Sequence, residues 1–241
     1  MDSIEHLKAI REESSCFARA ARGPLDARVP SCPEWSLGDL VWHLGGVQWF
    51  WSEIVRTRAT DREGIVKPRD RPDDELIDWF ETVSAGLVTA LEDADPTTLV
   101  WSWAGGQQDL AWVKRRQAHE AAVHRWDAQL TVGQPEPIAT TLAVDGIDEF
   151  FEWMFDLEGV RDSSPSVAVQ LAPTDADLSW VVSVRDDAID LAADATAAEA
   201  TAVASTSDLL LLLWRRVGAD DVAVDGDRSA LERFLEIADL A

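Results

Sequence analysis

The period of the hydrophobic pattern changes once along this 241-residue chain, near residue 157, and the change divides the chain into two parts of different structural class. Up to that point apolar residues recur every three or four positions, which is typical of amphipathic helices. Beyond it they alternate with polar or small residues, which is typical of strands with one buried face. We therefore expect a mainly helical domain over residues 1–157, followed by a small α+β domain over residues 158–241.

Five helical segments are predicted in the first domain. The first begins at Asp2 or Ser3 and ends at the pair Gly23-Pro24. The second begins at a capping box formed by Ser36 and Asp39. Four helices of this length suggest an antiparallel four-helix bundle. The other helical segments are predicted over residues 74–91, 109–131 and 141–157, with a charged loop over residues 56–71.

The second domain is predicted to begin with a β-hairpin. Residues 167–171 and 180–184 each alternate between apolar and polar or small side chains, and turn-forming residues separate the two runs. Further extended stretches are expected near residues 189–191 and 202–204. Helices are predicted over residues 207–217 and 229–238.

The charge of the chain excludes several classes of partner. Forty-five acidic and 21 basic residues give a formal net charge of -24, which repels nucleic acid and anionic membrane surfaces. No apolar run approaches the roughly 20 residues of a membrane span, and the first residues lack the features of a secretory signal. We expect a cytoplasmic protein, monomeric or homodimeric, that binds small molecules. An anionic substrate would need local positive charge from a metal ion or from clustered arginines.

Two predicted helices carry side chains that could hold a metal ion. At about 100° per residue, Glu120 and His124 project within an apolar arc, and their spacing of one helical turn lets them converge. His43 lies among apolar positions of the second helix, so it should also face the interior. One carboxylate and two imidazoles are typical of catalytic metal sites, because three protein ligands leave coordination positions open. The opposite arc of the fourth helix is expected to face solvent, with Lys114, Arg115, Ala118, Ala122 and Arg125.

Ordinary structural roles are the alternative for each of these residues. A single inward histidine is more often a hydrogen-bonded core residue, and Glu120 could simply pair with Arg116. Asp127 could orient a ligand imidazole or pair with Arg116. The metal site is favoured because a buried carboxylate and two histidines are costly unless something neutralises them.

Three further pairs of residues have less specific interpretations. His6 and His119 are expected to be partly exposed. Cys16 and Cys32 match no metal or redox spacing, so we expect free thiols. Trp101 and Trp103 are expected in a loop, where they could wall a pocket.

Two motifs resemble the mycothiol-dependent maleylpyruvate isomerase family, a branch of the DinB-like superfamily. They are Val29-Pro-Ser-Cys-Pro-Glu-Trp-Ser-Leu-Gly-Asp-Leu-Val-Trp-His43 and His119-Glu-Ala-Ala-Val-His-Arg-Trp-Asp127. Residues 207–216 and 224–234 are similar to the small C-terminal domain of that family, which resembles sterol carrier proteins. The resemblance thus covers nearly the whole chain.

The resemblance implies a DinB-like helical bundle with zinc bound by His43, Glu120 and His124, and mycothiol as thiol cofactor. It also implies an arginine from the C-terminal domain that helps to hold the substrate. This arginine corresponds to Arg215 or Arg216, and the Arg-Arg pair leaves open which one. Gln129 departs from the family, where a carboxylate is common at this position.

The function implied is activation of a low-molecular-weight thiol that attacks a small electrophilic substrate. Addition to a double bond, rotation and elimination give isomerisation, whereas retention of the sulfur in the product gives S-transfer. The sequence leaves both open. Two alternatives are a small-molecule binding or regulatory protein that retains the metal site, and a metal-dependent hydrolase that needs no thiol.

Overall fold

The computed structural model describes residues 1–155, 166–185, 188–192 and 198–237, and its contacts divide the chain into two compact units. The helical unit comprises residues 1–138 and the sheet unit comprises residues 139–241. The boundary therefore differs from the predicted one after residue 157. Helix α5 (Thr140–Glu149) belongs to the sheet unit because it packs against helix α6 (Thr206–Leu213).

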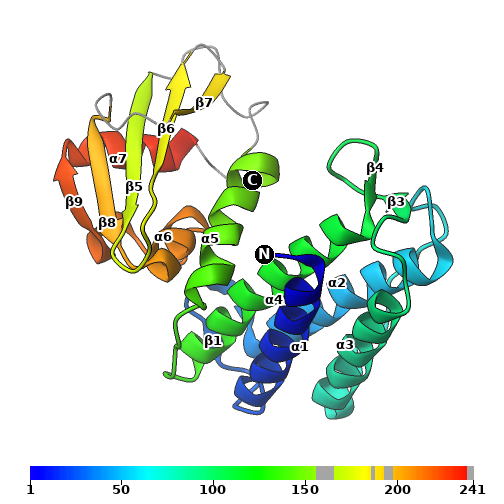
Figure 1. Cartoon of the computed structure of the whole chain (residues 1–241). Helices are drawn as coiled ribbons and strands as arrows, with labels where there is room; N and C mark the ends of the chain where they lie inside the picture. The colour runs from blue at the N-terminus through cyan, green and yellow to red at the C-terminus, as the bar shows by residue number, and fades with distance from the viewer. Residues whose placement is uncertain (156–165, 186–187, 193–197, 238–241) are drawn as a thin grey trace. The chain divides into compact units, whose positions relative to one another are not determined.

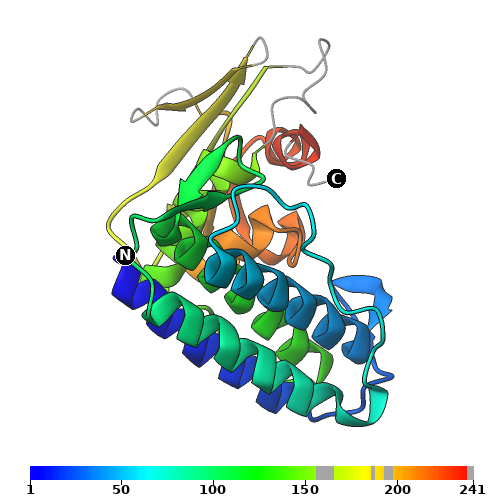
Figure 2. The same cartoon turned by 90° about the vertical axis from the view of Figure 1, so that its right-hand side faces the viewer.

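Four long helices build the helical unit, as predicted. Helix α1 packs against both α3 and α4, and α2 packs against the same two helices. Figures 1 and 2 show α1 and α3 side by side along their length. The helices are α1 (Ser3–Ala20), α2 (Leu37–Thr57), α3 (Leu76–Glu92) and α4 (Leu110–Thr131).

Capping boxes fix where the first two helices begin. The Asp2 carboxylate accepts from the backbone N–H of Glu5, whose side chain accepts from the N–H of Asp2. Ser36 and Asp39 form the same reciprocal pair at the start of α2. Both predicted starts are confirmed. The second cap, Ser36, lies seven residues before His43 and fixes the residue at which α2 begins.

Two short hairpins connect the helices of this unit, and neither is predicted from the sequence. Strands β1 (Arg28–Val29) and β2 (Cys32–Ser36) pair antiparallel just before α2. Strands β3 (Leu99–Trp101) and β4 (Gln107–Asp109) pair in the same way before α4. Strands of two to five residues are too short to show a period of two, so the hydrophobic pattern does not reveal them.

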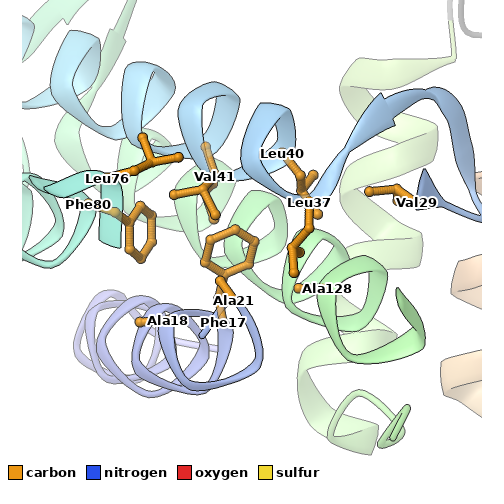
Figure 3. Close-up of a cluster of buried hydrophobic side chains, with 11 residues drawn as sticks. Phe17, Ala18, Ala21, Val29, Leu37, Leu40, Val41, Leu76, Phe80 and Ala128 are labelled. Atoms are coloured by element: carbon orange, nitrogen blue, oxygen red, sulfur yellow. The ribbon is translucent and has the colours of Figure 1, made fainter. Parts of the chain in front are cut away.

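The core of the helical unit joins all four helices. The rings of Phe17 and Phe80 lie 4.8 Å apart, and Figure 3 shows Phe17 surrounded by side chains of the neighbouring helices. From α2, Leu40 and Leu44 are completely buried in this cluster. They flank His43 in sequence, so the core holds α2 in the orientation that decides where His43 points.

The sheet unit contains one five-stranded sheet in the order β7-β6-β5-β8-β9. The predicted hairpin is confirmed, since β5 and β6 pair antiparallel with Val169 opposite Val182. Strand β8 runs parallel to β5, and the other neighbours are antiparallel. The four-residue strand β9 is not predicted. The strands are β5 (Val167–Pro173), β6 (Trp180–Arg185), β7 (Ala188–Ala192), β8 (Ala200–Ala204) and β9 (Ala223–Gly226).

Helices α6 and α7 (Arg228–Ile237) pack against β5 and β8, and α7 runs across the sheet in Figure 1. Helix α6 ends at Leu213, earlier than the predicted residue 217, because Arg215 has a left-handed backbone with φ of 59°. After α5 the chain forms a π-helical turn, Phe150–Met154, and the last two residues of the predicted fifth helix lie outside the described residues. In the described part of the chain, no helix has the length and apolar character needed to cross a bilayer.

Adjacent glycines in α2 give a test of how α2 and α3 pack. A Cβ at Gly45 would lie 2.3 Å from Cζ3 of Trp79, whereas a Cβ at Gly46 would meet nothing closer than 3.8 Å. We expect Gly45→Ala to lower the free energy of unfolding by about 1–3 kcal/mol through overpacking. Gly46→Ala should raise it by up to about 1 kcal/mol, because alanine favours the helix. Urea unfolding measures both, and equal effects would contradict the close approach of Trp79.

Candidate metal centre

Helices α2 and α4 bring His43, Glu120 and His124 together. The Oε1 atom of Glu120 lies 3.5 Å from Nε2 of His43 and 3.4 Å from Nε2 of His124. The two imidazole rings are 5.1 Å apart and nearly perpendicular. The three side chains offer ligand atoms that all lie within 4.8 Å of one another. This is the convergence that helical projection of the sequence predicts.

The separations match the spacing of ligands around one metal ion. Zinc binds imidazole nitrogen and carboxylate oxygen at about 2.0–2.2 Å, so two ligands of a tetrahedral ion lie about 3.4 Å apart. Distances of 3.4 and 3.5 Å are long for charge-assisted hydrogen bonds, which are about 2.7–2.9 Å. Two nitrogen donors and one oxygen donor with this geometry therefore fit a divalent ion. The binding of such an ion by these residues stays a prediction.

Glu120 uses its second oxygen for a different contact. Arg116, one turn earlier on α4, donates from Nη2 to Oε2 of Glu120 over 3.0 Å. Burial raises the pKa of Glu120, but the interactions with His124 and His43 and the charge of Arg116 outweigh it, so the pKa lies well below its ordinary value. The ion pair of Arg116 and Glu120, which is the alternative to a metal site, is thus present. It leaves Oε1 of Glu120 directed at the two imidazoles.

Asp127 orients the imidazole of His124. Nδ1 of His124 donates to Oδ2 of Asp127 over 2.9 Å, and Ser31 donates from its hydroxyl to Oδ1 over 2.6 Å. Asp127 is completely buried. Burial lowers the pKa of His124, but Asp127 and Glu120 raise it more, to about 9. A carboxylate behind a ligand histidine fixes its tautomer and directs the other nitrogen toward the metal.

The centre is partly exposed. The side chain of His124 is 9% exposed, whereas those of Glu120 and His43 are 20% and 35% exposed. His43 also lines a cavity of about 480 Å³ together with Trp35 and Trp42. The ring of Trp35 lies 4.7 Å from that of His43. The volume of this cavity is within the range of small-molecule sites, about 300–1,000 Å³.

Several expectations about burial are wrong. His6 and His119, expected to be partly exposed, are 4% and 0% exposed, and their rings lie 6.1 Å apart. The arc of α4 expected to face solvent is also largely buried, including the charged residues Lys114 and Arg125. Arg125 donates to Glu13, to Gln129 and to backbone carbonyls near residue 136, which compensates its burial. An amphipathic projection cannot recognise a helix that is buried on both arcs.

The tryptophans after α3 have a structural role. Trp101 lies in strand β3 and packs near Phe50 and Trp51, while Trp103 packs edge-on against Trp112. They do not line the cavity beside His43 in the described part of the chain. Both cysteines are free, as expected.

Sequence reasoning does not single out Ser31, Trp35 or Lys67, which lie beside the candidate centre or its cavity. Ser31 and Trp35 fall inside the motif of residues 29–43, so the motif could have indicated that they lie near the site. Lys67 lies in the predicted charged loop, where no periodicity indicates which way a side chain points.

Comparison with known proteins identifies the family of the N-terminal region and structures of similar fold. A family model described as the mycothiol maleylpyruvate isomerase N-terminal domain matches residues 7–129. The solved structure of the mycothiol-dependent maleylpyruvate isomerase superposes with a TM-score of 0.63 at 14% identity. A histidine-to-alanine mutant of that isomerase gives 0.62 at 13% identity, and both comparisons cover 93% of each chain. No curated protein matches the sequence.

The raised pKa of His124 predicts that metal binding releases protons. With a pKa of about 9, His124 is protonated at pH 7 before metal binds, whereas a ligand nitrogen must be unprotonated. We expect about one proton to leave His124 per zinc bound at pH 7, and zinc affinity to fall as the pH is lowered below 9. Calorimetric titration in buffers of different ionisation enthalpy measures the proton count.

Asp127→Asn is the matched variant, since it keeps the shape but removes the charge behind His124. It should release fewer protons at pH 7 and bind zinc about 10–100 times more weakly. Zinc binding by the wild type without proton release between pH 6 and 8 would contradict a protonated His124.

Proposed function

This chain belongs to the mycothiol maleylpyruvate isomerase family, whose N-terminal domain it contains, and we propose that it is a zinc- and mycothiol-dependent enzyme acting on a small electrophile. The observation that carries the proposal is the convergence of His43, Glu120 and His124 beside an open cavity. Similarity in fold to the mycothiol-dependent maleylpyruvate isomerase over both units supports it.

The donor set supports zinc as the metal. Two imidazoles and one carboxylate are a ligand set that catalytic zinc sites use, and three protein ligands leave a position for an exogenous group. When bound there, zinc would stabilise the deprotonated form of a coordinating thiol near neutral pH. The exposure of Glu120 and His43 puts the open side of the centre toward solvent and the cavity.

The residues of this chain prepare the centre in distinct ways. Glu120 supplies a negative charge at neutral pH, because its pKa is held low. Asp127 and Ser31 fix the ring of His124, so its Nε2 is directed at the same point as Nε2 of His43. Trp35 packs against the ring of His43 and provides an apolar wall for the bound reactants.

The substrate arginine implied by the family is better assigned to Arg216 than to Arg215. The guanidinium of Arg215 donates to the carbonyls of Leu213 and Leu235, and so ties the end of α6 to α7. Arg216 donates to the carbonyl of Trp214 through Nη1. We infer that Arg215 stabilises the sheet unit and that Arg216 contacts the substrate.

The proposal extends to the fold of each unit, the oligomeric state and the location in the cell. The pairwise packing of α1 to α4 supports a DinB-like four-helix bundle, and the sheet with α6 and α7 supports a sterol-carrier-like unit. We infer a cytoplasmic monomer or homodimer. Isomerisation and S-transfer use the same activated thiol and differ in whether the sulfur leaves the product.

The metal content of the purified full-length chain tests the proposal. We expect about one zinc per wild-type chain, and loss of zinc in His43→Ala and Glu120→Gln, because each removes one of three ligands. Mycothiol should bind only to the zinc-loaded protein, which should then turn over maleylpyruvate or another electrophile. Elemental analysis, calorimetry with mycothiol and a turnover assay measure these effects.

Glu53→Gln is a matched control, since it makes the same chemical change on α2 outside the site and should keep the metal. A folded wild type that takes up no zinc would reduce the three residues to a buried polar network and favour a binding protein. Hydrolysis of an ester or amide without thiol would instead favour the hydrolase.

The two adjacent arginines give a second test within this proposal. Arg216→Ala should lower turnover at least about tenfold, the effect of losing one charged contact, and should lower the free energy of unfolding by less than Arg215→Ala does. Arg215→Ala should lower the free energy of unfolding by about 1–3 kcal/mol, because carbonyls at the end of α6 lose their donor. Turnover and urea unfolding of both variants measure this, and the reverse pattern would exchange the two roles.

A further inference from the structure

The cavity beside His43 has walls of different character. Its floor is the face of α2 that carries Trp42, His43 and Gly46, and Trp35 forms part of one wall. Lys67, from the segment between α2 and α3, lines the cavity as well. A molecule in this cavity therefore meets a ligand of the candidate metal centre, aromatic rings and an ammonium group.

The side chain of Lys67 lies over Gly46 of α2. A Cβ at this position would lie 3.8 Å from Cδ and 3.9 Å from Nζ of Lys67, so the lysine side chain lies directly over the glycine. Gly46 follows His43 by three residues, and Cβ positions with this spacing are about 5–6 Å apart on a helix. The ammonium group is thus within about 10 Å of the Cβ of His43, a distance that one small molecule can span.

Lys67 is available to a ligand. Within the described residues it has no hydrogen-bond or ion-pair partner, although the chain carries a net charge of -24. Asp39, which lines the same cavity, is already bonded to Ser36 and Arg71. Glu34 also lines the cavity and is exposed, but it forms no ion pair with Lys67 among the described contacts.

We propose that Lys67 binds a carboxylate of an anionic substrate at the mouth of the cavity. The assignment of the other, reacting end of that substrate to the metal centre rests on the proposed function. Lys67 thereby selects small carboxylates over neutral electrophiles of similar size. Glu34, which lines the same cavity, weakens the binding of an anion there, because like charges repel.

Binding of maleate, a small dicarboxylate, to the zinc-loaded full chain tests this role. We expect Lys67→Met to raise the dissociation constant about tenfold, because one charge-assisted contact is lost. Lys67→Arg should retain binding within about threefold, since it keeps the charge. Glu34→Gln should tighten binding. Raising the ionic strength should weaken binding to the wild type more than to Lys67→Met.

Lys8→Met is the matched control, because it changes the net charge by the same amount at an exposed site on α1, where Lys8 pairs with Glu12. It should leave maleate binding unchanged. Equal dissociation constants for the wild type and Lys67→Met, or no maleate binding by the wild type at millimolar concentration, would overturn the proposal. Zinc content is measured on the same samples. Maleate binding that depends on Lys67, in protein that holds no zinc, would overturn the metal centre alone. Bound zinc together with maleate binding that does not depend on Lys67 would overturn the anion site alone.

Discussion

The burial of ionisable side chains between α2 and α4 is the constraint on which the rest of the helical unit depends. Withdrawing a carboxylate from water costs several kcal/mol unless charges and hydrogen bonds compensate. Glu120 satisfies this with both oxygens, one bonded to Arg116 and one directed at the two imidazoles. His124 in turn needs Asp127, and Asp127 needs Ser31. The polar network therefore extends from α4 to the turn between β1 and β2, and a bound cation would replace the proton of His124 at its open end.

Helical spacing explains why much of this network can be predicted from sequence. Intervals of three or four residues place side chains on one helix face, so a single stripe of α4 supplies most of the polar groups: Arg116, Glu120, His124 and Asp127. The capping box at Ser36 marks the start of α2, and the apolar neighbours of His43 indicate which face of that helix is turned to the core. The three candidate ligands converge because each lies on the inward face of its helix, and a few residues of sequence are enough to predict that face.

Features set by long-range packing are not readable in this way. Lys114 and Arg125 have the spacing of a solvent-facing arc, yet both are buried, because nothing local indicates that α4 is covered on that side as well. The position of Lys67 over Gly46 depends on the path of an irregular segment, for which no period exists. The domain boundary differs for a similar reason. Helix α5 is periodic like the helices before it, and only its packing against α6 assigns it to the sheet unit.

The net charge of -24 bears on which ligands can reach the centre. Acidic surface groups repel anions, but at physiological salt their field is screened over about 8 Å. A ligand in the cavity beside His43 lies closer than that to Lys67, so the charges of the lining side chains act on it more strongly than the distant acidic surface groups. A small carboxylate that fits between Lys67 and the metal centre can therefore bind, whereas a polyanion remains outside against the acidic surface. The same distribution of charge thus admits small anions and excludes large ones. A small anion contacts only the side chains that line the cavity, whereas a large one also contacts the acidic surface.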